Sequence, residues 1–131
     1  MSNLPVDRKY TKDHEWAQGA GSEITVGITA FAVEQLGDIT LVNLDVKVGD
    51  AINIGEPFGT IESVKTLSDL YAPVGGTVVK VNGDLTSKPE LVNEDCYGKA
   101  WMIVIGAKDR STVDGLMDVA GYGDYLKAAS H

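Results

Sequence analysis

The chain has 131 residues, about the length of one domain, and its 19 acidic and 11 basic side chains give a formal net charge of −8. This acidic balance repels phosphate backbones and anionic membrane surfaces, which argues against a nucleic-acid or lipid partner. Hydrophobic residues make up 44% of the sequence and charged residues 23%, and this composition excludes a wholly disordered chain.

Cysteine content and hydropathy indicate the compartment. Cys96 is the single cysteine, so the chain can form neither an internal disulfide nor a cysteine zinc cluster. No segment approaches the roughly 18 apolar residues of a membrane span, and Met1 to Lys12 lacks the apolar core of a signal peptide. The sequence therefore predicts a soluble, intracellular protein.

Short runs rich in Val, Ile and Thr, separated by many of the 15 glycines, predict a mainly β fold with tight turns. We expect strands at 23–28, 39–44, 51–54, 58–61, 77–81 and 101–105. Helical spacing predicts one short helix between Ile28 and Gly37, with Gly37 as its C-cap.

A weaker helical pattern follows Ser111. Ser111 and Asp114 have the spacing of a capping box, with Asp in place of Glu. We expect Gly115, Gly121 and Gly123 to divide this tract into two short helices.

Two segments resemble each other, because residues 48–52 and 74–78 each place a glycine turn before an apolar strand. They predict either two similar half-sheets packed face to face or a chance similarity within a glycine-rich β protein, and the sequence does not decide between them.

Catalytic patterns are weak. The two histidines, His14 and His131, offer no triad and no metal-ligand spacing, and no glycine-rich phosphate loop occurs. The acidic pairs Asp13/Glu15 and Glu94/Asp95 have the residue types of a glycosidase dyad, although such pairs are more often solvated surface charges.

The segment from Glu62 to Gly76 places one lysine, Lys65, between two strand-like arms. A hairpin with a lysine at its tip would expose a single amine to a modifying enzyme. The alternative is an ordinary surface lysine on an edge strand, since the turn carries no Asn-Gly or Asp-Gly signal.

Around Lys65, and over nearly the whole chain, ordered motifs resemble the glycine cleavage H-protein family. They are Tyr10, His14-Glu15-Trp16, Val26-Gly27-Ile28-Thr29, Leu36-Gly37-Asp38-Ile39, Glu62-Ser63-Val64-Lys65, Ser68-Asp69, Tyr71-Ala72-Pro73-Val74, Val81-Asn82, Pro89-Glu90-Leu91-Val92-Asn93-Glu94-Asp95, Tyr97-Gly98 and Trp101. A lipoyl domain of a 2-oxoacid dehydrogenase would lack the His-Glu-Trp and Pro-Glu-Leu-Val-Asn blocks. A biotin carrier would flank its lysine with methionine.

The resemblance implies one lipoyl-carrier domain over 1–131, with a core at about 10–106 and a helical extension at about 111–128. The implied fold is mainly β, with two packed antiparallel sheets of the lipoyl-domain (barrel-sandwich hybrid) type, a lysine-bearing hairpin, and short helices that include a C-terminal helical tract. Lipoate would be attached covalently to Lys65, and a ligase would recognise the hairpin residues Glu62, Ser63 and Val64.

The implied activity is that of a non-catalytic carrier. It would accept the aminomethyl group of glycine from glycine decarboxylase (P protein), deliver it to aminomethyltransferase (T protein), and be reoxidised by dihydrolipoyl dehydrogenase (L protein). A lipoyl ligase or transferase would also be a partner. The implied form is a monomer without nucleic-acid or membrane partners, in the bacterial cytoplasm or, for the mature chain of a eukaryote, in the mitochondrial matrix.

In this family the loaded arm folds back into a cleft on the carrier. By resemblance, that role falls on Asp13, Glu15 and Asp69, whose carboxylates would hold the aminomethyl ammonium. The alternative is that Asp13 and Glu15 form a solvated edge. We expect Trp16 and Trp101 to lie in the core or the cleft wall and His14 to form a structural hydrogen bond.

Two positions depart from the family pattern. Cys96 stands where proline is common, so the loop before Tyr97 loses a constraint on φ. Thr66-Leu67 follows the lysine where small residues are frequent. Two alternatives remain open besides the glycine-cleavage carrier: a lipoyl-relay protein or lipoyl domain serving another dehydrogenase complex, and an enzyme that uses the carboxylate clusters.

Overall fold

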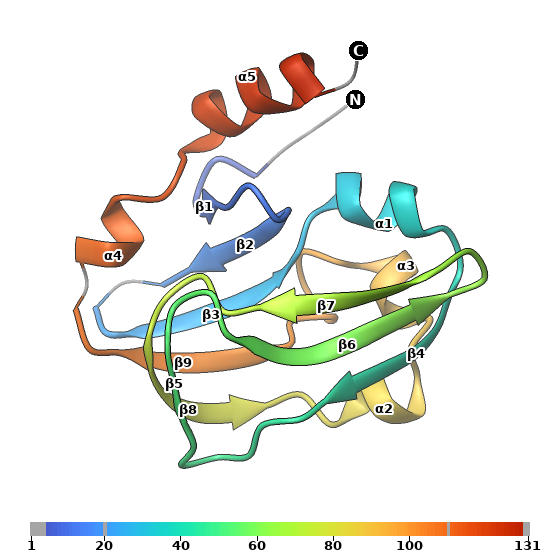
Figure 1. Ribbon diagram of the computed structural model, residues 1–131, viewed down its shortest axis with the longest axis horizontal. Coiled ribbons are helices and arrows are strands. Elements are labelled where there is room, and N and C mark those ends of the chain that lie inside the picture. Colours follow the sequence, from blue (N-terminus) through green and yellow to red (C-terminus); the bar gives the residue numbers. More distant parts are fainter. Residues whose placement is uncertain (1–4, 20, 110, 130–131) are drawn as a thin grey trace.

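The computed structural model describes residues 5–19, 21–109 and 111–129, and its strands form two antiparallel sheets (Figure 1). The larger sheet has the spatial order β1-β2-β3-β9-β8-β5, and the smaller sheet has the order β4-β6-β7. In chain order the strands are β1 (Lys9–Tyr10), β2 (Glu15–Gln18), β3 (Glu23–Ile28), β4 (Ile39–Leu44), β5 (Ala51–Ile52), β6 (Pro57–Ser63), β7 (Leu67–Tyr71), β8 (Gly76–Val81) and β9 (Ile103–Ala107). The helices are α1 (Ala30–Leu36), α2 (Asp84–Ser87), α3 (Leu91–Glu94), α4 (Ser111–Asp114) and α5 (Val119–Ala129).

The main core lies between the two sheets. Alternating residues of β3 point inward, which is why this strand is apolar at every second position. In β6 a register shift between Pro57 and Gly59 lets Phe58 and Ile61 both be buried. Ile24, Val26, Phe58 and Ile61 are each at most 1% exposed and belong to one buried cluster. The predicted mainly β architecture with two packed antiparallel sheets is therefore confirmed.

A second, aromatic cluster lies under α5. Tyr10, Trp16 and Tyr122 are each at most 1% exposed, and the rings of Tyr10 and Tyr122 stack with their centroids 4.7 Å apart. The indole of Trp16 covers the backbone of its cross-strand partner Gly27, where a Cβ would lie 2.5 Å from a ring carbon. Glycine is required there because any side chain would displace the tryptophan.

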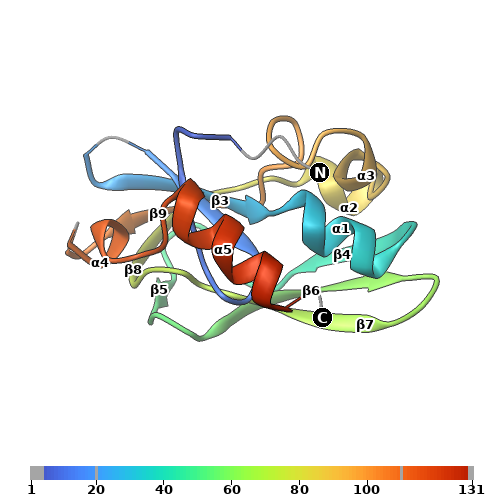
Figure 2. The same cartoon turned by 90° about the horizontal axis from the view of Figure 1, so that it is seen from above.

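Different elements lie at the two ends of the molecule. The β6–β7 tip projects at the end that also carries α1 and α3, whereas α4 lies at the other end (Figures 1 and 2). Helix α5 packs against β1, so the C-terminal segment lies beside the N-terminal strands.

The predicted strand positions are largely confirmed, but two strands and two helices were missed. The missed strands are β1 and β2, and the missed helices are the single turns α2 and α3. Strand β7 was expected only as the second arm of the lysine hairpin, without bounds. The expected strand at 51–54 is shorter, covering Ala51–Ile52, and the strand expected at 101–105 begins at Ile103. The similar segments at 48–52 and 74–78 do not form two facing half-sheets: Ala51 pairs with Thr77 in one sheet.

The C-terminal tract forms two helices as predicted, but its details differ. Ser111 does not precede α4 as a cap but is its first residue, and the Asp109 carboxylate accepts its backbone N–H over 3.0 Å. Only Gly115 lies between the helices, while Gly121 and Gly123 lie within α5. Burial of Tyr122 against the aromatic cluster outweighs the cost of about 1 kcal/mol that each helical glycine carries.

No helix among residues 5–19, 21–109 and 111–129 is both long and apolar enough to cross a membrane.

Candidate functional site

Lys65 lies in the turn between β6 and β7. The backbone N–H of Ser63 donates to the carbonyl of Thr66 over 2.8 Å and closes the turn. The Ser63 hydroxyl oxygen accepts the N–H groups of Lys65 and Thr66 over 3.1 and 3.2 Å. Lys65 is exposed, and its neighbours Val64 and Leu67 are 67% and 61% exposed. Ser63 therefore satisfies the backbone of the turn and leaves the lysine amine in solvent.

The tip is attached to the turn between α1 and β4. Val64 N–H donates to the carbonyl of Asp38 over 3.0 Å. The residues on either side of Asp38 are both held by Asn93 of α3, whose amide donates to the Gly37 carbonyl over 3.0 Å and accepts the Ile39 N–H over 2.9 Å. Helix α3 thus fixes the turn on which the lysine hairpin rests.

Gly37 also borders the lysine side chain itself. Gly37 is the C-cap of α1, as predicted. Its φ of 81° is a backbone conformation that residues with a Cβ rarely adopt. A Cβ built there would lie 3.4 Å from Cε of Lys65. The aliphatic stem of Lys65 therefore runs beside a position that glycine leaves open.

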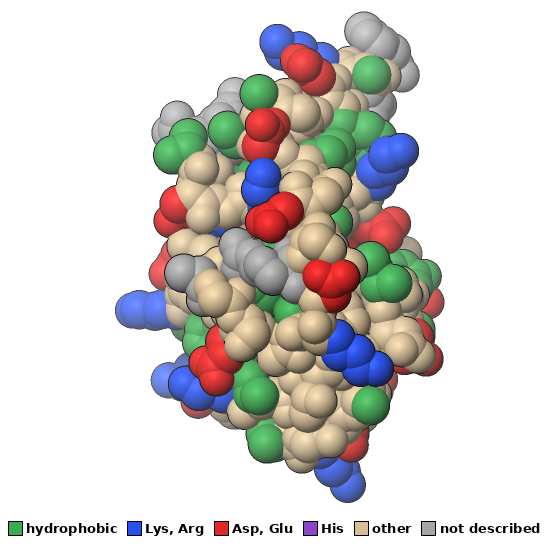
Figure 3. Space-filling view, turned by 90° about the vertical axis from the view of Figure 1, so that its left-hand side faces the viewer, with side chains coloured by type: hydrophobic (Ala, Val, Ile, Leu, Met, Phe, Trp, Pro, Cys, Tyr) green, Lys and Arg blue, Asp and Glu red, His purple; other side chains and the backbone are tan. Residues whose placement is uncertain are grey.

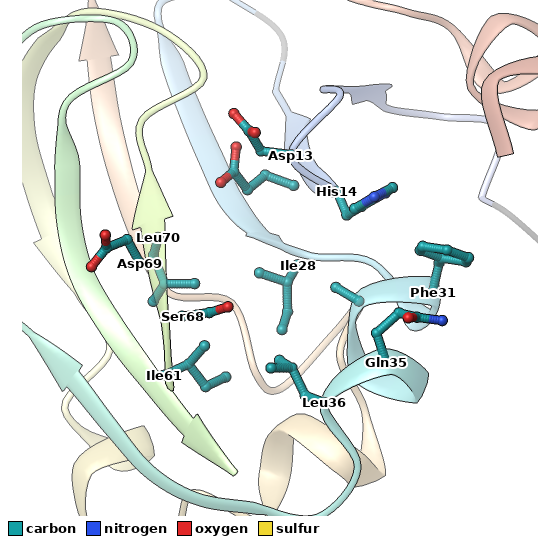
Figure 4. Close-up of a pocket in the computed structure, with 12 residues that line it drawn as sticks. Asp13, His14, Ile28, Phe31, Gln35, Leu36, Ile61, Ser68, Asp69 and Leu70 are labelled. Carbon is teal, nitrogen blue, oxygen red and sulfur yellow. The ribbon is translucent and has the colours of Figure 1, made fainter. Parts of the chain in front are cut away.

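A cleft of about 300 Å³ lies between β7 on one side and α1 and the β1–β2 turn on the other (Figure 4). Its lining residues are Asp13, His14, Glu15, Ile28, Phe31, Ala32, Gln35, Leu36, Ile61, Ser68, Asp69 and Leu70. Aliphatic side chains from β3, α1, β6 and β7 form its floor, and three carboxylates lie at its border. A cleft of this composition suits a ligand with a hydrocarbon body and a cationic end.

Glu15 is the buried carboxylate of the cleft, with 2% exposure. One oxygen accepts the backbone N–H of Tyr71 over 3.0 Å, and the other accepts the Thr11 hydroxyl over 3.0 Å. Burial raises the pKa of Glu15 to about 7, although both hydrogen bonds oppose this rise. A cation in the cleft would favour its ionised form.

Asp13 and Asp69 are both exposed and border the cleft on opposite walls, although the Asp69 carboxylate points to the side of β7 away from the cleft floor (Figure 4). Asp13 belongs to the β1–β2 turn, and Asp69 lies in β7, where its carboxylate accepts the Tyr71 hydroxyl over 3.3 Å. The structure thus brings together all three carboxylates that were expected at the cleft, and Glu15 is no solvated edge residue. Their binding of an ammonium group stays a prediction.

His14 forms the structural hydrogen bond predicted for it. Its Nδ1 lies 2.8 Å from the hydroxyl of Tyr122, and its ring lies 4.6 Å from that of Phe31. Its φ of 66° is unusual for a residue with a side chain, and it turns the chain between β1 and β2. Burial lowers the pKa of His14, while the nearby Asp13 opposes this, so the ring is neutral at neutral pH.

Hydrogen bonds hold the loop that contains Cys96. The buried Trp16 donates its indole N–H to the Cys96 carbonyl over 3.0 Å, and Arg8 donates to the Tyr97 carbonyl over 3.0 Å. Burial raises the pKa of the Cys96 thiol to about 11, so the thiol stays protonated.

The other candidate residues lie outside the cleft. Trp16 belongs to the aromatic cluster, and Trp101, which is partly exposed, packs at its edge. Glu94 and Asp95 are exposed at the end of α3, and Asp95 accepts the Lys99 backbone N–H over 2.9 Å. Within the described ranges, no three His, Cys, Asp or Glu side chains are placed to hold a metal ion.

The sequence analysis missed several residues of the cleft and hairpin. The segment of α1 was predicted as a helix but not as a cleft wall. Asn93 was noted only as part of a longer motif, and Thr11 and Tyr122 were not singled out. Thr11 and Tyr122 contact cleft residues through hydroxyl groups, which leave no periodic signal in a sequence.

Comparisons with known proteins agree with this geometry. The family model described as "Glycine cleavage H-protein" matches residues 8–129. The "Glycine cleavage system H protein" of Halalkalibacterium halodurans is 51% identical over 126 residues, which cover 96% of this chain and 98% of that protein. The protein of the same name from Anaeromyxobacter sp. (strain K) is 47% identical over 124 residues, covering 95% and 96%.

A solved structure is also similar. The crystal structure of a glycine cleavage system H protein from Mycobacterium marinum superposes with a TM-score of 0.83 at 36% identity, covering 98% of this chain and all of that one. These matches confirm the predicted fold class and the predicted function of a carrier rather than an enzyme. The chain belongs to the glycine cleavage H-protein family.

Proposed function

We propose that Lys65 is the lipoyl attachment site through which this chain serves the glycine cleavage system. The observation that carries the proposal is the exposed amine at the tip of the β6–β7 hairpin, in a turn that Ser63 holds in one shape. A ligase would recognise that shape through Glu62, Ser63 and Val64. Glu62 and Val64 are exposed, and Val64 is fixed by its bond to Asp38.

Position in the fold distinguishes Lys65 from the other lysines. Lys80 lies within β8, where its backbone pairs with β9, and Lys99 follows the short helix α3 in an open loop. Neither lies at the tip of a two-stranded hairpin. We therefore expect both amines to remain free.

The cleft supports a resting place for the loaded arm. When attached, the lipoyl group supplies a dithiolane that takes up an aminomethyl group and later releases it. Asp69 lies four residues after Lys65 along β7, about 13 Å at strand spacing, which an extended lysyl-lipoyl arm can span. Ile28, Leu36 and Ile61 would contact the hydrocarbon part of that arm.

The carboxylates would hold the cationic end of the arm. Glu15 is fixed by Tyr71 and Thr11 before any ligand arrives, so it would need no reorganisation to accept an ammonium group. Asp13 and Asp69 add negative charge at the rim of the cleft. Exclusion of water from this site would slow the hydrolytic loss of the aminomethyl group.

The partners would be the P, T and L proteins together with a lipoyl ligase or transferase. Exchange among several enzymes requires weak binding, which suits an exposed tip carried on a rigid scaffold with a net charge of −8. The opposite end of the molecule shows acidic, basic and hydrophobic side chains interspersed (Figure 3), so we place the enzyme contacts at the tip end. The relatives compared above are bacterial, and we propose that the carrier acts as a monomer in a bacterial cytoplasm.

Mass spectrometry tests the attachment site. The chain is incubated with a lipoyl ligase, lipoate and ATP, and its intact mass and tryptic peptides are measured. We expect one lipoyl group on the wild type, one on the matched control Lys99→Arg, and none on Lys65→Arg. Lipoate found on Lys65→Arg would contradict the proposal, whereas copurification with dehydrogenase complexes instead of the P and T proteins would favour the lipoyl-relay alternative.

The lifetime of the loaded carrier tests the cleft. Wild type and the variants Glu15→Gln and Asp69→Asn are loaded with P protein and glycine, freed of enzyme, and followed by mass spectrometry. In Asp69→Asn the loaded arm should be bound about 1 kcal/mol less tightly, so the aminomethyl group should be lost roughly five times faster. Glu15→Gln should have a larger effect because Glu15 is buried. Glu34→Gln, an exposed α1 residue outside the cleft, is the matched control. Equal decay in all four proteins would contradict the cleft assignment.

A further inference from the structure

Tyr122 of α5 contacts the two segments that form one side of the cleft, the β1–β2 turn and α1, without lining the cleft itself. Its side chain is 0% exposed, and its hydroxyl lies 2.8 Å from His14 Nδ1 and 2.8 Å from Thr29 Oγ1. His14 belongs to the β1–β2 turn, which carries Asp13 and leads into Glu15 of β2. Thr29 is the N-cap of α1, the helix beside this turn on the same side of the cleft.

Thr29 and His14 are themselves joined through the backbone. Thr29 N–H donates to the His14 carbonyl over 3.0 Å, and the Thr29 hydroxyl oxygen accepts the N–H of Ala32 over 3.3 Å. The spacing between the turn and the first turn of α1 therefore depends on a small set of buried hydrogen bonds. The Tyr122 hydroxyl is the member of this set that comes from the C-terminal helix.

The protons of this network have one arrangement that satisfies every group. Thr29 Oγ1 already accepts from Ala32, so its own proton is free to be donated to the Tyr122 oxygen. Tyr122 then donates its proton to Nδ1 of His14. The reverse order would leave the proton of the fully buried Thr29 hydroxyl without an acceptor. The burial that lowers the pKa of His14 also favours a neutral ring, which this chain of donors requires.

We propose that Tyr122 is a positioning residue for the cleft, which holds His14 as its Nε2–H tautomer and fixes the Asp13–Glu15 turn relative to α1. This inference rests on the proposed function, because the cleft is taken to hold the loaded arm. Stacking on Tyr10 fixes the Tyr122 ring, so the hydroxyl acts from a rigid support. Helix α5 thus contributes to retention of the aminomethyl group although none of its described side chains lines the cleft.

The test compares two tyrosines of α5 that differ in what their hydroxyls contact. Tyr122→Phe keeps the ring and its stacking and removes the hydroxyl. Tyr125→Phe is the matched control, because its hydroxyl contacts the Lys12 carbonyl at 3.4 Å and neither His14 nor Thr29. Each lipoylated carrier is loaded as described above, and its decay is measured beside that of wild type and Glu15→Gln. We expect Tyr122→Phe to shorten the loaded lifetime threefold to tenfold and Tyr125→Phe to leave it unchanged.

Nitrogen-15 NMR of His14 supplies a readout that loss of stability alone would not produce. In the wild type we expect an unprotonated Nδ1 and a protonated Nε2, and in Tyr122→Phe a mixture of tautomers. A protonated Nδ1 in the wild type would overturn the inference, and this measurement decides it even where Tyr122→Phe folds poorly. A normal lifetime in Tyr122→Phe beside a shortened one in Glu15→Gln would also overturn it while the proposed cleft stands. Normal lifetimes in both variants would overturn the cleft and the inference together.

Discussion

The hairpin tip and the carboxylate end of the cleft are built in opposite ways. At the tip, the Ser63 hydroxyl satisfies the backbone of its own turn and Lys65 remains exposed. At the cleft, Glu15 is buried and bonded to Tyr71, 56 residues away in the sequence. A group that other enzymes must reach is thus supported locally, whereas a group that must exclude water is held by segments from distant parts of the chain.

The largest effect is expected from removing the amine at the tip. Lys65→Ala should abolish lipoylation completely, as measured by intact mass, and leave the melting temperature within about 2 °C of wild type. The physical reason is that an exposed side chain contributes little buried apolar area. Glu15→Ala is the contrasting variant, because it should remain lipoylated and lose stability. A fall of more than a few degrees for Lys65→Ala would show that the tip is not independent of the fold.

The second prediction concerns the pH dependence of stability that buried Glu15 introduces. The folded state retains the Glu15 proton up to about pH 7, whereas the unfolded chain releases it near 4.5. Stability therefore falls as the pH rises through this window, by about 3 kcal/mol in total, and is unaffected by Glu15 below it. Glu15→Gln should remove this loss.

Urea unfolding of wild type and Glu15→Gln at pH 5 and pH 8 measures the effect. The comparison is made between the two proteins because His14 acts in the opposite direction: its lowered pKa costs stability as the pH falls below 6.5. That contribution is common to both proteins and cancels in the difference. Identical pH profiles would mean that Glu15 is as solvated as the tip.

The third prediction concerns the serine that shapes the tip. Ser63→Ala removes the acceptor of two backbone N–H groups and should cost about 1 kcal/mol of unfolding free energy, since water can reach part of the turn. Lipoylation should slow because the turn samples other shapes. Ser63→Thr keeps the hydroxyl and is the control. A variant with unchanged ligase kinetics would show that the turn shape is not what the ligase reads.

The smallest effect is expected at Asn93, which acts on the tip through the Gly37–Ile39 turn. Asn93 is exposed, so Asn93→Ala should cost less than about 1 kcal/mol. Its more specific effect should be faster amide hydrogen exchange at Val64, whose N–H donates to Asp38. Exchange at Met102 N–H, which donates to Val26 in the core, is the internal control. Equal exchange rates at Val64 in wild type and Asn93→Ala would show that α3 does not stabilise the hairpin tip.

The difference between local and distant contacts explains which elements and site residues could be predicted from the sequence. Lys65 was found because a short motif surrounds it, β3 because its apolar alternation is regular, and β6 because of its length and composition. Strand β7 was expected only as an arm of the hairpin, without bounds, because Leu70 is its single fully buried residue. Strand β2 was missed because a buried acid, Glu15, occupies an inward position. An Asn-Gly turn was sought at the tip, whereas the serine turn present there was the informative signal.

The hydrogen-bond networks were out of reach for a different reason. Tyr122 meets His14 over 108 residues and Thr29 over 93, and nothing in the spacing of these residues indicates that they meet. Likewise, Gly121 and Gly123 suggested a helix break because local propensity does not include the packing of Tyr122 on Tyr10. Tertiary contacts decided both cases.

The pairing of Tyr10 with Met117 has a consequence for the order in which the protein is assembled during translation. Tyr10 N–H donates to the Met117 carbonyl over 2.8 Å, and Met117 N–H donates back over 3.0 Å. Strand β1 can pair with β2 early, but its bridge to Met117 requires a segment synthesised more than a hundred residues later, whereas β6 and β7 can pair as soon as both have emerged. We expect a nascent chain to present its lysine hairpin before the pocket beside it is complete.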